Sequence, residues 1–381
     1  MISRRALLVS AAATAACTKP KAQRFLGFCF VANRDAHSIG VVDLTRFRTR
    51  RPIPLDAAPS QILARPRTTK AYILAPSAGT VYELEAGLQS ITRRVRAGNA
   101  AVAMRLSRDN NALWVLYRDP ASLVEIPFDT MRPGRRIRLA APPADFDLSR
   151  QTDRALVVST AARTISLASL STASIDQTIQ APAEPTIARF RDDGTQLISG
   201  SHSDRSLTVY DVPTGKTVVR LPLSIAPREF CFTSDGGHLY VTGDGMDAVV
   251  SVFPYRTEVW ETLLAGHAPG AMAIFESDRP PSYLMVANPD AASVTVLDVE
   301  TGNLVAVVQV GRGPRQIVIT PDNQYALVLN QESCDMAVIR IFSLGGTQVG
   351  GERVKRYKSA PVFTMIPVGE SPVSAAVVAL T

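Results

Sequence analysis

The strongest constraint on the fold is a landmark that recurs along the chain at nearly constant spacing. Five successive intervals are 42 residues long, the next is 45, and the last contains an insertion. The landmark residues are Pro59, Ala101, Pro143, Pro185, Pro227, Pro269, Pro314 and Pro372. A period of about 40–45 residues indicates one supersecondary unit that is repeated and packs against its own copies.

The clearest copy of this unit runs from Pro227 to Ala265. Short runs of β-branched and aromatic residues occupy 229–233, 238–242, 248–253 and 259–264, and turn residues such as Asp235-Gly236 separate them. Four such runs, about ten residues apart, indicate antiparallel sheet. An α-helical repeat array is the alternative for this period, but it needs long amphipathic helices, whose periodicity the chain does not sustain. The sequence therefore predicts an all-β fold, a β-propeller of four-stranded antiparallel blades.

The two ends of the chain predict how the ring closes. Residues 374–380 resemble only the first strand of a blade, whereas residues 25–33 and 38–44 resemble the second and third strands. We expect the N- and C-terminal strands to share one blade, which removes the unpaired edges of the ring. Counting landmarks gives eight blades. Seven is the alternative if one weak repeat, 101–142 or 143–184, is misread.

The first 24 residues predict export. Residues 3–8, Ser-Arg-Arg-Ala-Leu-Leu, resemble a twin-arginine motif, and the apolar run at 6–16 is too short for a hydrocarbon core of ~30 Å. Residues 14–17, Thr-Ala-Ala-Cys, resemble a bacterial lipobox, with Thr14 in place of the usual leucine. We predict a signal peptide at 1–17, lipidation at Cys17, a tether at 18–24 and a single propeller domain at 25–381. The expected location is periplasmic or membrane-anchored in a bacterium, with cleavage and release as the alternative to lipidation.

The charge of the chain narrows the range of partners. The formal net charge is +7, and loss of Arg4 and Arg5 with a signal peptide would leave +5. Arginines are scattered, and small groups such as that at 132–138 are expected to form solvated faces of strands. We expect no nucleic-acid partner for an exported protein, membrane contact only through a lipid anchor, and a monomer. A small anionic ligand or an envelope protein is the expected partner.

Several repeats resemble the bacterial YVTN-type β-propeller family. The resemblance rests on Gly-Arg-Gly-Pro at 311–314, the strand and Pro-Asp turn at 317–322, and Tyr-Val-Thr-Gly at 240–243. It covers nearly the whole chain after residue 25, strongly from 185 onward and faintly between 60 and 180. The resemblance implies the propeller fold but leaves the activity open, because the family's relatives include exported and surface-layer proteins, lactonase-like enzymes and haem-binding propellers.

The sequence contains no motif that would mark catalytic chemistry. It has no C-x-x-C-H, H-E-x-x-H, G-x-S-x-G or P-loop. We therefore predict no catalytic residue, no metal site and no cofactor, and expect a non-catalytic binding or scaffolding module. The alternative is a lactonase-like hydrolase, or a redox protein that uses haem or metal at the channel mouth.

One mouth of the central channel is the expected ligand site, because the loops between blades and the loops between second and third strands converge there. Arg228 and Arg315 each follow a landmark proline directly, and planar guanidinium groups suit carboxylate or phosphate ligands. Structural ion pairs and amide caps of loops are the alternative roles for these side chains. The candidate residues are Arg228, Glu229, Arg312, Arg315, His267, His202, Asn288 and Asn330.

Overall fold

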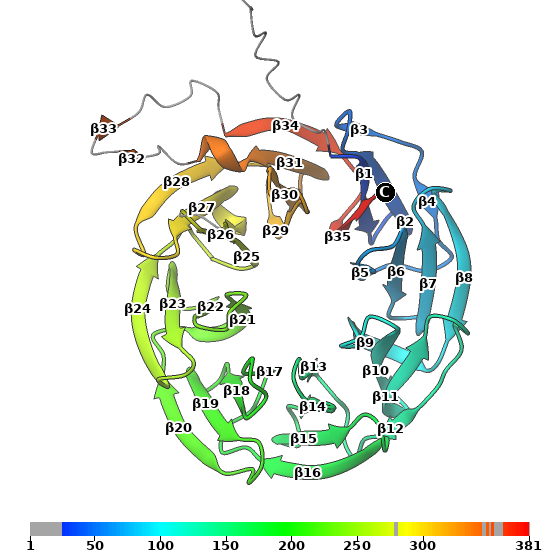
Figure 1. The fold of residues 1–381 in the computed structure, drawn as a ribbon, viewed down its shortest axis with the longest axis vertical. Coiled ribbons are helices and arrows are strands. Elements are labelled where there is room, and N and C mark those ends of the chain that lie inside the picture. The colour runs from blue at the N-terminus through cyan, green and yellow to red at the C-terminus, as the bar shows by residue number, and fades with distance from the viewer. Residues whose placement is uncertain (1–24, 278–280, 345–347, 350–351, 354–360, 381) are drawn as a thin grey trace, which may run out of the picture.

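Eight antiparallel sheets surround a common axis and form a closed ring (Figure 1). The computed structural model describes residues 25–277, 281–344, 348–349, 352–353 and 361–380. The predicted fold and the count of eight blades are confirmed. Both weak repeats build complete four-stranded blades, over residues 99–138 and 145–180, so the seven-blade alternative is wrong. The predicted signal peptide, Cys17 and the tether lie outside the described residues.

Blades are numbered here from the N-terminus, blade 1 beginning after Pro59 and blade 8 being the one that both chain ends share. The first strand of each blade lines the channel, and the second packs behind it. The inner strands are β5 (Gln61–Ala64), β9 (Asn99–Leu106), β13 (Asp145–Leu148), β17 (Ile187–Phe190), β21 (Ala226–Phe232), β25 (Met272–Phe275), β29 (Pro314–Ile319) and β35 (Pro372–Ala379). The second strands are β6 (Lys70–Ala75), β10 (Ala112–Asp119), β14 (Arg154–Ser159), β18 (Gln196–Ser201), β22 (Leu239–Asp244), β26 (Tyr283–Asn288), β30 (Tyr325–Asn330) and β1 (Gly27–Asn33).

The third and fourth strands complete each blade toward the outside of the ring. The third strands are β7 (Thr80–Glu85), β11 (Ala121–Pro127), β15 (Thr164–Ser169), β19 (Ser206–Asp211), β23 (Ala248–Phe253), β27 (Ser293–Asp298), β31 (Asp335–Arg340) and β2 (Ser38–Asp43). The outer strands are β8 (Ser90–Arg96), β12 (Arg136–Arg138), β16 (Ser174–Gln180), β20 (Thr217–Pro222), β24 (Glu258–Leu264), β28 (Leu304–Gln309), β34 (Val362–Pro367), β3 (Arg48–Thr49) and β4 (Ile53–Pro54). The remaining elements are the hairpin β32 (Gln348–Val349) and β33 (Glu352–Arg353) and the 3-10 turns η1 (Pro289–Ala291) and η2 (Ile341–Ser343).

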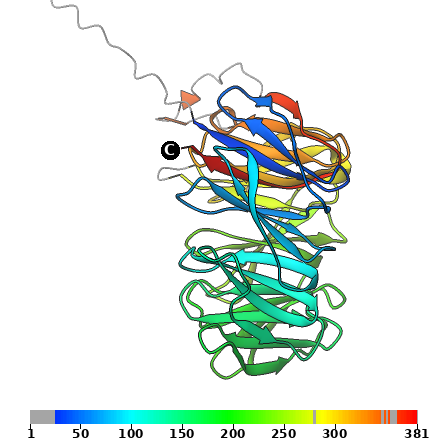
Figure 2. The ribbon, with the colours of Figure 1, turned by 90° about the vertical axis from the view of Figure 1, so that its right-hand side faces the viewer.

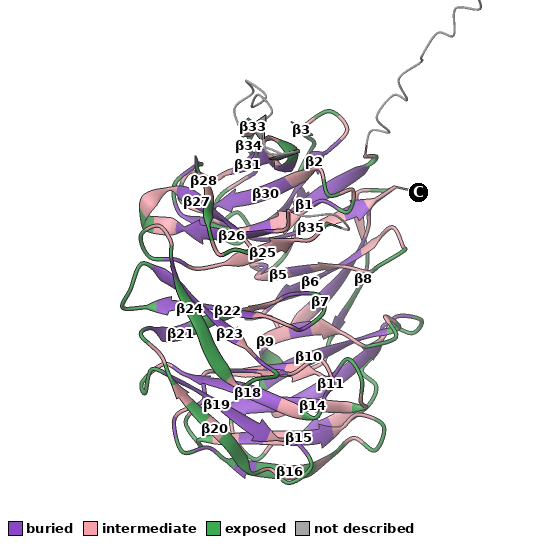
Figure 3. Ribbon diagram, turned by 60° about the vertical axis from the view of Figure 1, so that its left-hand side comes forward, coloured by how far each residue is buried: buried purple, intermediate pink, exposed green. Residues whose placement is uncertain are grey.

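The position of a strand in its blade explains its sequence pattern. Second strands are covered on both faces by neighbouring blades, so they read as continuous apolar runs, such as ALWVLY in β10. Outer strands face solvent on one side, and β16 alternates exposed and covered residues along SIDQTIQ. Figure 3 shows this gradient, with buried middle strands and exposed stretches on outer strands. No helix in the described part of the chain is long and apolar enough to cross a membrane.

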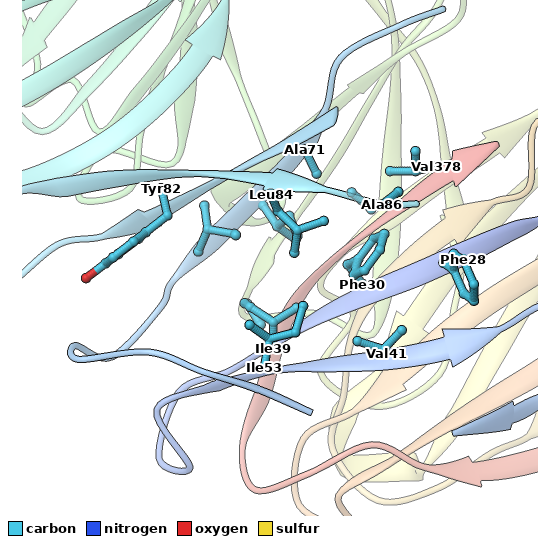
Figure 4. Packing of buried hydrophobic residues seen from close by; sticks show 14 of the residues in the cluster. Phe28, Phe30, Ile39, Val41, Ile53, Ala71, Tyr82, Leu84, Ala86 and Val378 are labelled. Atoms are coloured by element: carbon cyan, nitrogen blue, oxygen red, sulfur yellow. The ribbon is translucent and has the colours of Figure 1, made fainter. Parts of the chain in front are cut away.

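Blade 8 closes the ring as predicted. Strand β1 pairs antiparallel with β2 on one side and with β35 on the other. On one face of this sheet Phe30 and Ile39 pack with residues of blade 1 such as Leu84 (Figure 4). On the other face Val31 packs with Leu327 of blade 7. Burial on both faces therefore holds the two ends of the chain together. Figure 2 views the ring from its side, where loops project from two opposite faces.

Candidate functional site

A cavity of about 550 Å³ opens at the channel mouth over blades 4 to 7. As expected, both loop sets form it, because it includes landmark prolines and residues that follow second strands. Its lining consists of Glu184, Thr186, His202, Ser203, Pro227, Arg228, Glu229, Pro269, Gly270, Ala271, Pro289, Pro314 and Arg315. The structure therefore brings four of the predicted site residues together in one cavity: Arg228, Glu229, Arg315 and His202.

Two equivalent β-bulges place the arginines of this cavity. In blade 5, Pro227 pairs with Gly243 and Glu229 with Thr242, which leaves Arg228 as the extra residue. In blade 7, Pro314 pairs with Asn330 and Gln316 with Leu329, which leaves Arg315 as the extra residue. A bulge takes one residue out of the ladder and re-aims its side chain. The same bulge carries Val102 in blade 2 and Val373 in blade 8, so the fold does not require arginine there.

Blade 6 leaves space between the two arginines. Gly270 occupies the position that Arg228 and Arg315 occupy in the neighbouring blades, and it also lines the cavity. A Cβ atom added to Gly270 would meet nothing closer than 4.0 Å, the distance to the Ala287 carbonyl oxygen and to Pro289 Cγ. Sequence reasoning missed Gly270 and Thr186, although their constant phase after a landmark proline could have identified them.

Asp244 binds Arg228 at the edge of the cavity. The Arg228 Nε donates a hydrogen bond of 2.6 Å to Asp244 Oδ2, and His202 Nε2 lies 2.9 Å from the same oxygen. The hydrogen bond from His202, together with that from Arg228, lowers the pKa of the Asp244 carboxyl. This aspartate already compensates the charge of Arg228.

Arg315 and Glu229 differ from that pair. Within the described residues, neither side chain has a hydrogen-bond or ion-pair partner. The Glu229 side chain is open to the channel, but the inner wall of the ring surrounds it. The resulting loss of hydration raises the pKa of its carboxyl group. The positive charges of Arg189 and Arg315 act in the opposite direction, and their effect is smaller. Among the residues that the structure describes, the cavity thus presents one guanidinium and one carboxyl group that form no hydrogen bond or ion pair, and each of the two acts on the other only through its charge.

In four blades the side chain at the inner-strand position equivalent to Glu229 joins one blade to the next. The side chains of four counterparts accept the backbone N–H of the following blade. These contacts are Gln61 to Met104 N at 2.9 Å, Asp145 to Ala188 N at 3.3 Å, Gln316 to Ala375 N at 2.6 Å and Ser374 to Ile62 N at 3.2 Å. Glu229 forms no such bond, so its carboxylate has no structural role of this kind.

Two further predicted residues lie outside the cavity lining. His267 Nδ1 lies 2.9 Å from Asp247 Oδ2, and this interaction raises the pKa of the exposed imidazole. Arg312 is exposed, and its backbone N–H donates a hydrogen bond of 3.0 Å to Ser333 Oγ. His202 and His267 contact different carboxylates, and no three His, Cys, Asp or Glu side chains gather as a metal-binding group in the part of the chain described.

The two asparagines are fully buried, and both form side-chain hydrogen bonds. Asn288 Nδ2 donates a hydrogen bond of 2.9 Å to Thr295 Oγ1, and its Oδ1 accepts the Gly266 N–H at 3.1 Å. Asn330 Nδ2 donates to Asp335 Oδ1 at 2.6 Å. The contact of Asn288 with Gly266 agrees with the alternative interpretation, in which a side-chain amide holds loop backbone in place. Asn330 instead contacts the Asp335 side chain.

A larger cavity of about 840 Å³ lies on the opposite face, among blades 1 to 3. Its arginines are already engaged. The Arg135 guanidinium binds Glu125 through two hydrogen bonds of 2.7 and 2.5 Å and lies 5.7 Å from the Trp114 ring. Arg65 donates to the Asn110 carbonyl at 2.9 Å, and Arg108 donates to a backbone carbonyl of blade 3. Arg135 therefore forms a structural ion pair with Glu125. The sequence had instead predicted a solvated strand face for the arginines at 132–138.

Comparison with known proteins supports the propeller class. The lactonase family model, described as a seven-bladed β-propeller, matches residues 214–347. A seven-bladed β-propeller protein of Mycobacterium tuberculosis is 24% identical over 144 residues, which are 36% of this chain and 37% of that protein. The chain thus spans just over a third of the length of this relative. The matched stretches belong to seven-bladed proteins, whereas the ring of this chain has eight blades.

Solved structures share the fold at low sequence identity. The dihydro-heme d1 dehydrogenase NirN in complex with DHE has a TM-score of 0.73 at 15% identity, covering 92% of this chain and 75% of that one. Hydrazine synthase of Kuenenia stuttgartiensis has a TM-score of 0.59 at 19% identity, covering 74% and 95%. A functionally unknown protein of Desulfotomaculum acetoxidans has a TM-score of 0.59 at 11% identity, covering 93% and 99%. At these identities the likeness concerns the fold alone.

Proposed function

We propose that this chain is an exported, envelope-associated propeller of the YVTN type that binds a small anionic ligand at its channel mouth without catalysing a reaction. The observation that carries the proposal is the unpaired Arg315 guanidinium at a cavity that a second arginine, Arg228, also lines. A guanidinium presents a rigid fork of N–H donors, which matches the oxygens of a carboxylate or phosphate. The twin-arginine-like segment at 3–8 and the lipobox-like segment at 14–17 support export.

Calorimetric titration of the purified protein with small carboxylates and with inorganic phosphate tests this proposal. Arg315→Val is expected to weaken binding at least tenfold, because it removes the free cation, while valine is already accepted at the same bulge in blades 2 and 8. Arg312→Val is the matched control, since this exposed arginine lies outside the cavity. Equal loss in both variants, or no binding by the wild type, would contradict the proposed site.

A lactonase-like hydrolase is the second candidate. It is favoured by the lactonase family match over 214–347 and by Glu229 at the channel mouth, a carboxyl group whose pKa is raised by burial and which could transfer a proton. Release of acid from simple γ- and δ-lactones, abolished by Glu229→Gln, would support this candidate over the binding module.

A further inference from the structure

We propose that the ligand of the mouth cavity is a small zwitterion with an apolar body, of the type of an α-amino acid with an apolar side chain. This inference rests on the proposed function and specifies its ligand. Arg315 would take the carboxylate, and Glu229 would take the ammonium group. The apolar body would lie against the proline-rich wall between them.

The first support comes from the charges that the fold leaves unpaired. Asp244 compensates Arg228, so the charged groups at the cavity that have no hydrogen-bond or ion-pair partner in the described part of the chain are the Arg315 guanidinium and the Glu229 carboxyl. A dianion held by Arg315 would bring its second negative charge into the cavity that Glu229 also lines, and repulsion between like charges disfavours binding. A ligand with one negative and one positive group satisfies both side chains with charge-assisted hydrogen bonds.

The second support is that the ring does not need an acidic residue at position 229. The equivalent inner-strand positions of blades 2, 4 and 6 carry Ala103, Ile187 and Ala271, which cannot accept a hydrogen bond from the next blade. Where the counterpart is polar, as in Asp145 and Gln316, it bonds that blade. Glu229 is polar but unbonded, so it remains available to a ligand.

The third support is the shape and chemistry of the wall. Pro227, Pro269, Pro289 and Pro314 line the cavity. Proline rings are rigid, apolar and lack an N–H donor, so they offer a surface for hydrocarbon. A volume of about 550 Å³ falls in the usual range of small-molecule sites, about 300–1,000 Å³. Gly270 has no side chain and leaves space beside this wall. The wall and this space suit an amino acid such as leucine or phenylalanine.

Matched probes that differ in one charged group test the inference. Leucine, 4-methylpentanoate and leucinamide share one hydrocarbon skeleton, as do phenylalanine, 3-phenylpropanoate and phenylalaninamide. Titration calorimetry with the whole protein is expected to show that at least one amino acid binds tenfold or more tightly than its acid and its amide. Glu229→Gln should abolish the preference for the amino acid over the acid, and Arg315→Val should weaken amino acid and acid alike. Glu300→Gln, an exposed glutamate on a turn of blade 6 at the opposite face, is the control.

A cavity-filling variant separates failure of this inference from failure of the proposed function. Gly270→Leu adds a side chain where the nearest atoms are 4.0 Å from a Cβ, and it should block binding without removing a charge. If acids bind as tightly as amino acids and Glu229→Gln changes nothing, the zwitterion is wrong and the anion site stands. If no probe binds, or if binding survives both Arg315→Val and Gly270→Leu, both proposals are overturned.

Discussion

Two cavities on opposite faces of this ring differ in how their arginines are used. The cavity among blades 1 to 3 is the larger, yet Arg65, Arg108 and Arg135 in its lining all donate hydrogen bonds to the protein. The mouth cavity over blades 4 to 7 is smaller, yet Arg315 there has no partner among the described residues. The difference teaches that volume alone does not identify a candidate binding site, and that charged side chains without a protein partner are the better criterion.

Beside the larger cavity, Arg93 shows how strongly the arginines of this face are tied to the protein. It binds Glu83, whose side chain is only 1% exposed, and donates to the carbonyl groups of Phe128 and Asp129 in the next blade. Arg93→Met should lower the free energy of unfolding by about 3 kcal/mol, because it removes a main partner of a buried carboxylate. Arg315→Val should change it by less than about 0.5 kcal/mol. Urea unfolding of the two variants measures the contrast, and similar losses would refute it.

A smaller loss is expected for the half-exposed pair of the same cavity. Arg135→Met should lower the free energy of unfolding by about 1–2 kcal/mol, since the guanidinium is 45% exposed but leaves Glu125 without its charge partner. The Trp114 fluorescence should shift as well, because Arg135 lies over this ring. The matched control is Arg228→Val, whose bulge accepts valine in other blades. A loss in Arg228→Val as large as in Arg135→Met would contradict the comparison.

The pH dependence of stability should have opposite signs at the two carboxyl groups. Hydrogen bonds from Arg93, Thr92 and Lys70 outweigh the loss of hydration and lower the pKa of Glu83 to about 2. Its stabilising effect is therefore present above its ordinary pKa and is lost as pH falls toward 2. The pKa of Glu229 is raised by burial. Ionisation of this carboxyl group therefore lowers the free energy of unfolding as pH rises above the pKa of an ordinary glutamate.

Unfolding midpoints in urea between pH 3 and pH 7 can separate the two contributions. Glu83→Gln should flatten the loss of stability toward acid, whereas Glu229→Gln should gain stability relative to the wild type as pH rises. Glu300→Gln serves as the exposed control. If Glu229→Gln instead lost stability at neutral pH, its carboxylate would have a structural partner, and the contrast between the two cavities would fail.

The sequence predicted the ring well because spacing along the chain is itself a property of the repeat. The landmark prolines marked the inner strands, and the patterns at 25–44 and 374–380 predicted the shared blade that β1 and β35 form. The unit after Pro227 was placed to within a few residues, with observed strands at Ala226–Phe232, Leu239–Asp244, Ala248–Phe253 and Glu258–Leu264. Each of these features follows from local strand and turn patterns and from their spacing along the chain.

The site was predicted only in part, because its chemistry depends on contacts between blades. Arg228, Glu229, Arg315 and His202 were placed at one mouth from their phase in the repeat, and the structure brings them to one cavity. Asp244 engages His202 of the preceding blade, 42 residues away in the sequence, and Arg228 on the neighbouring strand, 16 residues away. Neither contact follows from a local sequence pattern. The bulges could not be predicted either, since an extra residue in one strand is defined only by its register against the next strand.

The shared blade also has a consequence for how the protein is made. Strand β1 finds its second neighbour only when residues 372–379 have been synthesised, so the ring stays open through most of translation. Such distant pairing slows folding, and an open ring exposes strand edges that can join other chains. Until β35 arrives, the edge of β1 that it later covers is open to pairing with other chains.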